Sequence, residues 1–396
     1  MSLTFALSKP LVNYHNLLKE WSVAECRPYA REVDTNHLAP DNWRDVLASA
    51  PVPIGQKVGE HSGPKPQFEE GHWVADLVFH EALIYGDIWP MPLLGRGIGH
   101  LVVAAMGTPE QVERWYKPVA AGEGRAAIAI TEPGFGSDTS MVATTATRDG
   151  DRWVLNGSKI YCSSATTSTY ITVFATVDKS LGAKGIAAFV VPAGTPGLVI
   201  TKPNESKLGI RSWMTSAFSL DDCAVPIENR LGWVDDPNQT VRASGQSGAL
   251  SALSNNRPNI SAIAIAMAQA SIDCATDILR ERRHGFAVQR WSAIENEMHN
   301  MNAALDRGRR VNFAAQFPTD SGVPDRMLPA MAKAFSPQTA ERVIRRCMQM
   351  LGPDGTSTEL LLEKWYRDSK ILDIFEGSGQ VLRVIVARSL MGRAAG

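Results

Sequence analysis

The segment IAITEPGFGSD (residues 128–138) joins a short apolar β run to a loop rich in proline, glycine and hydroxyl groups. Because glycine has no Cβ, backbone N–H groups in such a loop can come close to a planar polar ligand, together with the hydroxyls of Thr131 and Ser137. The local alternative is a plain strand-to-helix turn in which Ser137 or Asp138 caps the helix. The segment alone leaves both interpretations open.

The spacing of apolar residues along the chain differs on the two sides of this segment. Before about residue 124, apolar residues recur at helical spacing, as in WVADLVFHEALIYGDI (73–88), which predicts helices. From about residue 127 to 232, short β-rich runs follow one another without intervening helices, which predicts a small barrel or sandwich and not a parallel α/β sheet. Within this region Asn156-Gly157 predicts a tight turn between two strands. From Pro258 onward the helical spacing returns.

Composition and charge exclude several classes of function. The chain has 396 residues, 40 basic and 41 acidic, with a net charge of −1, so there is no electrostatic case for binding nucleic acid. The five cysteines are scattered and never form a C-x-x-C spacing, which argues against a metal site or a disulfide framework and favours a cytoplasmic location. The N-terminus lacks the pattern of a signal peptide, and no apolar run of about 18 residues predicts membrane insertion.

A second informative segment is KILDIFEGSGQVLRVIVARSL (370–390), in which Glu376 lies at a glycine-marked break between two apolar helical stretches. A carboxylate flanked by Ile374 and Phe375 tends to be desolvated, which raises its basicity and suits it to act as a general base. The alternative is a surface acid or a neighbour of a helix N-cap.

Five motifs in order resemble the acyl-CoA dehydrogenase family. T-E-P-x-x-G-S-D (131–138) is similar to its first signature, and N-G-S-K-I (156–160) is similar to its N-G-x-K strand. K-L-G-I-R (207–211) resembles the end of its β-domain. Q-M-L-G (349–352) resembles its second signature, which leads into I-F-E-G-S (374–378). The resemblance runs from about residue 75 to the C-terminus.

The resemblance implies an α+β fold of three domains: an N-terminal helical domain (1–125), a middle β-barrel or sandwich (126–236) and a C-terminal four-helix bundle (237–396). It implies FAD as cofactor and an acyl-CoA as substrate. Glu376 would take the α-proton while flavin N5 accepts the β-hydride, giving a trans-2-enoyl-CoA. An electron-transfer flavoprotein would then receive the electrons, and a homotetramer is expected.

The resemblance also implies the residues that bind each group. Contacts to the flavin ring and its ribityl chain are expected from Ile128, Ile130, Thr131, Gly136, Ser137, Tyr161, Cys162, Ser163, Ser378 and Gln380. The adenosine half of FAD from a neighbouring subunit is expected to bind Arg282, Gln349 and Gly352. The substrate is expected to contact Ser137, Arg257 and Gly377. Relatives usually have tryptophan and threonine where this chain has Tyr161 and Ser163; the tyrosine keeps a flat ring and the serine keeps the hydroxyl.

Two departures from the family pattern concern the active site. Some relatives carry the base on another helix, immediately before an arginine; here that position is Asn256, before Arg257, and asparagine cannot act as a base. An acid of the family three residues before the arginine is replaced by Ser254. The segment after Arg282 is also shorter than the family's.

Two other functions stay open on the same residues. One is a flavin oxidase or monooxygenase on this scaffold, and the other is a non-catalytic partner subunit of a hetero-oligomeric dehydrogenase. The acyl group is equally open, because periodicity does not reveal which side chains would surround it; fatty, branched, aromatic and steroid-derived acyl groups all remain candidates.

Overall fold

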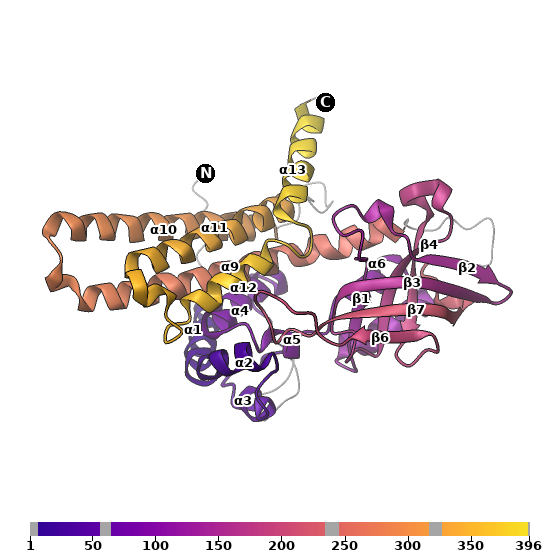
Figure 1. Ribbon diagram of the computed structural model, residues 1–396, viewed down its shortest axis with the longest axis horizontal. Coiled ribbons are helices and arrows are strands. Elements are labelled where there is room, and N and C mark those ends of the chain that lie inside the picture. The colour runs from indigo at the N-terminus through magenta and orange to yellow at the C-terminus, as the bar shows by residue number, and fades with distance from the viewer. Residues whose placement is uncertain (1–6, 56–64, 234–244, 317–326, 395–396) are drawn as a thin grey trace. The chain divides into compact units, whose positions relative to one another are not determined.

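The structure is a computed structural model that describes residues 7–55, 65–233, 245–316 and 327–394. The chain divides into two compact units (Figure 1). We call the first the helical unit; it comprises Met1–Leu94, Lys207–Ser212 and Asn256–Gly396. The second, the sheet unit, comprises Gly95–Ser206 and Trp213–Asn255.

The sheet unit is built on one seven-stranded curled sheet. Its strands are β1 (Ala126–Ala129), β2 (Thr145–Asp149), β3 (Arg152–Ser163), β4 (Tyr170–Thr176), β5 (Ile186–Pro192), β6 (Leu198–Lys202) and β7 (Thr215–Pro226). The path through the sheet is β1-β4-β2-β3-β7-β6, and β5 pairs with β4 on the side of this path. Most pairs are antiparallel, whereas β4 runs parallel to β1 and β2.

Strand β4 is buried along its whole length because the sheet is covered on both faces. Ile171 and Val173 pack on one face with Trp153 and Phe189. Tyr170 and Phe174 pack on the other face with apolar residues of α6 (Gly99–Met106). This explains why YITVFAT shows no alternation of apolar and polar residues. The helices α7 (Pro109–Gln111) and α8 (Lys117–Ala121) follow α6, and a capping box at Thr108 starts α7.

The predicted turn at Asn156-Gly157 is wrong. Both residues lie inside β3, where the pairing with β7 shifts register between Leu155 and Gly157. The glycine is needed because a Cβ on Gly157 would lie 2.5 Å from Oγ1 of Thr144. The turn of this hairpin is instead at Gly150, between β2 and β3, with a positive φ of 58°.

A buried ion pair ties two of the sequence motifs together inside the sheet unit. Lys159 Nζ donates to Glu132 Oε1 over 2.7 Å, and the two side chains are 0% and 5% exposed. Glu132 also accepts hydrogen bonds from the Ala143 and Thr144 amides. Burial alone raises the pKa of Glu132, but Lys159 and these hydrogen bonds hold that pKa below its usual value. Burial lowers the pKa of Lys159 to about 8. Both groups are therefore charged at neutral pH.

The helical unit combines N-terminal helices with a C-terminal bundle. The first group is α1 (Lys9–Trp21), α2 (Ala30–Asn36), α3 (Trp43–Ala48), α4 (His72–Gly86) and α5 (Met91–Leu94). The second is α9 (Gly245–Glu281, in this unit from Asn256), α10 (Val288–Ala314), α11 (Met327–Leu351), α12 (Leu362–Leu372) and α13 (Gly379–Ala394). Helix α11 packs against α10, α12 and α13. Buried Lys364 of α12 bonds to Asp87, just after α4, and so joins the two groups.

One described helix, α9 over Leu253–Glu281, is long and apolar enough by length and composition to cross a membrane. However, 67% of its apolar window is buried inside the protein. Packing in the core therefore accounts for its apolar residues.

The predicted fold class is confirmed: the structure has an N-terminal helical part, a middle curled sheet and a C-terminal helical part. The three domain ranges 1–125, 126–236 and 237–396 stay a prediction.

Replacing Glu132 by glutamine should destabilise the protein strongly, because Lys159 is left buried without its counter-charge. We expect the free energy of unfolding to fall by about 3–5 kcal/mol. Urea unfolding of Glu132→Gln measures this, and the matched control is Glu113→Gln, which removes the exposed pair of Glu113 with Lys117. Equal, small effects of the two substitutions would contradict a structural role for the buried pair.

Candidate active site

Glu376 lies in the turn between α12 and α13, in a backbone conformation that few side chains adopt. Its φ is 58°, and the φ of Gly377 is 98°. A non-glycine residue in the left-handed region costs on the order of 1–2 kcal/mol, so other contacts must hold the turn. Ser378 ends the turn as the N-cap of α13, and its Oγ accepts from the Val381 amide.

Two buried cations hold the carbonyl groups of this turn. Arg257 Nε donates to the Glu376 carbonyl oxygen over 3.2 Å. Lys333 Nζ, on α11, donates to the Gly377 carbonyl oxygen over 2.6 Å. Both side chains are almost fully buried. The positive charges and the hydrogen bonds compensate for the strained backbone.

The carboxyl group of Glu376 is desolvated, and only one of its two oxygens accepts a hydrogen bond from a described residue. Asn256 Nδ2 donates to its Oε1 over 2.6 Å, whereas its Oε2 is buried and has no hydrogen-bond partner among the described residues. Burial raises the pKa of the Glu376 carboxyl to about 7; the bond from Asn256 and the charges of Lys333 and Arg257 act in the opposite direction. A carboxylate with a pKa near neutrality and one free oxygen is suited to accept a proton.

The backbone amide of Glu376 is the other free polar group of the turn. Its N–H donates to no acceptor in residues 7–55, 65–233, 245–316 or 327–394, although Ile374 and Phe375, just before it, both bond to Ile371. Arg257 and Lys333 bind the carbonyl oxygens of Glu376 and Gly377, which follow this amide in the chain. These bonds fix the direction in which the N–H of Glu376 points. An N–H beside the base can donate to an oxygen on which negative charge develops.

Sequence reasoning missed Lys333. The lysine lies in the apolar segment MLPAMAKAF of α11, and a lone charge on an apolar helix face was the available signal. Burial lowers the pKa of Lys333 to about 8, and Asp373 and Glu376 counteract this lowering. Asp373 is buried as well; its carbonyl accepts from the Gly379 amide, so the acid belongs to the same turn whose Gly377 carbonyl accepts from Lys333.

The predicted flavin residues of the sheet unit gather where the end of β1 meets β3. Cys162 Sγ lies 3.2 Å from the Ile128 carbonyl oxygen, and the Ile160 amide donates to the Thr131 carbonyl. Cys162 is buried beneath this surface, so its side chain serves packing, and burial raises its pKa to about 12. Ile128, Ile130 and Thr131 are half-buried, and Gly136 and Ser137 are exposed in the following loop.

A bulge in β3 presents Tyr161 to solvent. The pairing with β7 shifts between Lys159 and Cys162, and Tyr161 takes a φ of 54° with its side chain 58% exposed. The hydroxyls of Thr131, Ser137 and Ser163 make no hydrogen bond within the described part of the chain. A flat ring and three free hydroxyls form a donor set that fits a planar polar ring such as a flavin.

The third predicted group lies at the far end of α9. Arg282 forms an ion pair with Asp354 over 2.6 Å, which brings it to the segment that begins at Gly352, where φ is 66°. Gln349 is exposed on the last turn of α11. Along α9, Arg282 lies roughly 35–40 Å from Arg257 at 1.5 Å per residue. Arg282 and Arg257 therefore do not belong to one local site.

The structure thus brings the predicted residues together in three groups. The base group contains Glu376, Gly377, Arg257 and Ser378, with Gln380 exposed on the first turn of α13. The β1–β3 group and the Arg282 group are separate from it in sequence. The individual roles of these residues stay predictions.

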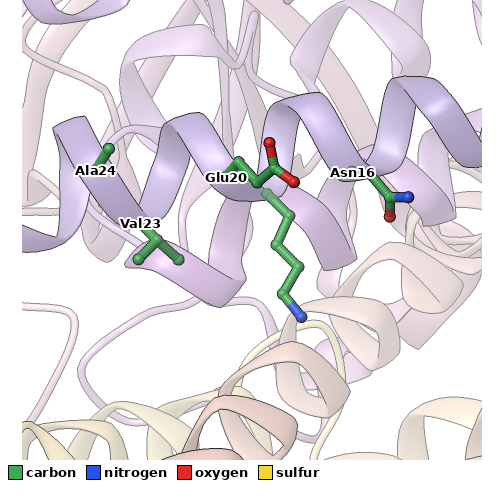
Figure 2. A pocket seen from close by; sticks show the side chains of 5 residues that line it. Asn16, Glu20, Val23 and Ala24 are labelled. Atoms are coloured by element: carbon green, nitrogen blue, oxygen red, sulfur yellow. The ribbon is translucent and has the colours of Figure 1, made fainter.

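A surface hollow along α1 and the segment after it is lined by Asn16, Lys19, Glu20, Val23 and Ala24. Figure 2 shows the labelled side chains projecting from successive turns of this single helical stretch. None of the residues predicted for catalysis or binding lines it. We assign it no role.

Comparison with known proteins agrees with this geometry. The model of the acyl-CoA dehydrogenase middle domain matches residues 127–223, and that of the acyl-CoA dehydrogenase C-terminal domain matches residues 243–391. The fold and the site therefore define a flavoprotein dehydrogenase of this class.

Individual relatives support the same assignment. Mitochondrial short-chain specific acyl-CoA dehydrogenase from Rattus norvegicus is 35% identical over 73% of this chain and 68% of its own length. Cyclohex-1-ene-1-carbonyl-CoA dehydrogenase from Geobacter metallireducens is 30% identical over 95% of this chain and 96% of its own length. The structure of butyryl-CoA dehydrogenase from Megasphaera elsdenii superposes with a TM-score of 0.84 at 26% identity, covering 98% and 100% of the two chains. The chain belongs to the acyl-CoA dehydrogenase family.

Membership confirms the coarser predictions. The protein is an oxidoreductase that acts on an acyl-CoA, and FAD is the cofactor of its family.

Replacing Gly377 by alanine should disturb the turn that carries Glu376. A Cβ there would lie 3.1 Å from Leu382 Cδ2 and 3.6 Å from Arg257 Nη2, at a φ of 98°. We expect a stability loss of about 1–2 kcal/mol and at least tenfold slower turnover, because the base shifts. Thermal unfolding and acyl-CoA turnover measure both.

Gly392→Ala is the matched control, since nothing lies within 4 Å of a Cβ at that exposed helical position. The control should keep its activity. Unchanged activity and stability of Gly377→Ala would contradict the strained-turn interpretation.

Proposed function

We propose that this protein catalyses the α,β-dehydrogenation of an acyl-CoA thioester to the trans-2-enoyl-CoA, with Glu376 as the base. The observation that supports it is that Oε2 of this carboxyl is buried without a hydrogen-bond partner within residues 7–55, 65–233, 245–316 and 327–394, while burial raises the pKa of the carboxyl to about 7. A thioester α-proton is only weakly acidic, so the base must be desolvated and correctly oriented.

Negative charge develops on the thioester carbonyl oxygen as the α-proton leaves. The N–H of Glu376, which has no acceptor among the described residues, can donate to this oxygen, and the buried Arg257 and Lys333 add positive potential behind the turn. When FAD is bound, its flavin ring supplies the acceptor for the hydride that leaves the β-carbon. Tyr161, Thr131, Ser137 and Ser163 would hold that ring through one flat face and three hydroxyls.

We further propose that an electron-transfer flavoprotein reoxidises the enzyme, that the enzyme is a homotetramer and that it is cytoplasmic. The first two rest on family resemblance, and the third rests on the scattered, unpaired cysteines. Arg282 lies at the far end of α9 from Arg257, and its ion pair with Asp354 brings it to the segment that begins at Gly352; this position supports a role of Arg282 and Gly352 toward the FAD of a neighbouring subunit.

The experiment mixes oxidised, FAD-loaded protein with fatty, branched, aryl-substituted and steroid-derived acyl-CoAs in the absence of air and records flavin absorbance. We expect at least one of these compounds to bleach the flavin and to yield its trans-2-enoyl-CoA. Failure of all acyl-CoAs would overturn the proposal. Rapid reoxidation of the bleached enzyme by air, without an electron-transfer flavoprotein, would instead favour an oxidase.

The second-order rate constant for bleaching should depend on pH through Glu376. The base must be ionised, and its pKa is raised to about 7, so the rate should rise with pH around a midpoint near 7 and fall below it. Stopped-flow measurements between pH 5 and 9, as a range of about two units on either side, test this. A flat profile through neutral pH would contradict Glu376 as the titrating base.

A further inference from the structure

The residue that holds the carboxylate of Glu376 is an asparagine on α9, one residue before Arg257. Its Nδ2 lies 2.6 Å from Glu376 Oε1. In the sequence this position looked like a vacant site for an alternative base. In the structure Asn256 instead touches the candidate base directly, and no other described residue bonds to the carboxylate.

The orientation of the Asn256 amide follows from its partners. An ionised carboxylate only accepts hydrogen bonds, so the NH2 end of the amide must face Glu376. The oxygen end is satisfied separately: Asn259 Nδ2, one turn along α9, donates to Asn256 Oδ1 over 3.1 Å. The amide is thus held at both ends and cannot turn over without losing both bonds.

We infer that Asn256 is a positioning residue for the base: its amide occupies Oε1 of Glu376 and leaves Oε2 to receive the α-proton of the substrate. This inference rests on the proposed function. Because the bond is made to the charged form of the carboxyl, it also favours ionisation of Glu376. Asn256 itself exchanges no proton.

The other charged groups around Glu376 are the same in the wild type and in variants at position 256. They are Arg257 on α9, Lys333 on α11 and, facing Lys333, Asp373 after α12. Arg257 and Lys333 favour the ionised carboxyl. Loss of the Asn256 bond should therefore move the titration of Glu376 to higher pH and leave these charges in place.

The test compares wild type, Asn256→Leu and Asn256→Ala, each loaded with FAD. Leucine keeps the size of the side chain and alanine adds no bulk. If one of the two variants fails to fold, the other still tests the inference. In both we expect the midpoint of the bleaching-rate profile to move upward by about 1–2 pH units, as for the loss of a hydrogen bond to a charged group. At neutral pH bleaching should slow by about 5- to 50-fold, because the ionised fraction of Glu376 falls from about a half to between about a tenth and a hundredth.

Asn312→Leu is the structural control. Asn312 is buried on α10 and donates to the Pro258 carbonyl on the same turn of α9 over 2.9 Å, without touching Glu376. This substitution should lower thermal stability but leave the midpoint unchanged. A merely structural role for Asn256 would give the same pattern as this control.

Infrared spectroscopy of the FAD-loaded protein without substrate provides a readout that does not depend on activity. The carbonyl-stretch band of the protonated Glu376 carboxyl is identified as the band that is present in the wild-type spectrum and absent from the spectrum of Glu376→Gln. Its titration should move upward in both Asn256 variants. Superimposable titrations of wild type and variants would overturn the inference. Absence of bleaching in wild type at every pH would instead overturn the proposed function, and the infrared titration would still decide on Asn256.

Discussion

The active site depends on one strained turn in which a carboxyl group is buried and aimed at the same time. Glu376 and Gly377 both take positive φ, and their carbonyl oxygens are bonded to Arg257 and Lys333. With the carbonyls bound on one side, the amide of Glu376 and its Oε2 have no hydrogen-bond partner in the part of the chain that the structure describes. Several helices supply these parts: α9 carries the arginine, α11 the lysine, and α12 and α13 end and begin at the turn. The geometry of the active-site turn therefore depends on the packing of these helices against one another.

The sheet unit uses buried charge in the same way. Lys159 and Glu132 bond inside the unit, where the glutamate also binds the amides of residues 143 and 144. This holds the loop that begins at Thr131 against β3, next to the bulge that exposes Tyr161. In both units a charged residue of a sequence motif fixes backbone geometry, while the neighbouring hydroxyl, amide or carboxyl groups stay available for a ligand.

Local pattern was enough to predict the elements, but not the contacts between them. The β-rich runs at 152–163 and 186–192 indicate strands because each places several apolar side chains in the core, and Glu376 was singled out from its motif and its apolar neighbours. Asn156-Gly157 was misread as a hairpin turn, since the same pair also fits a bulge where Thr144 approaches closely. Lys333 and Asn256 were not predicted as partners of the turn, because more than 40 residues of chain separate each from it and only packing brings them together.

The most direct test of the central claim is anaerobic mixing of FAD-loaded Glu376→Gln with the acyl-CoA that bleaches the wild type. Glutamine keeps the size of the side chain but cannot accept a proton, and its amide oxygen can still accept the hydrogen bond from Asn256. We expect a wild-type flavin spectrum, retained thioester binding and bleaching slowed by about 10³-fold or more. Bleaching within tenfold of the wild-type rate would show that another group removes the proton.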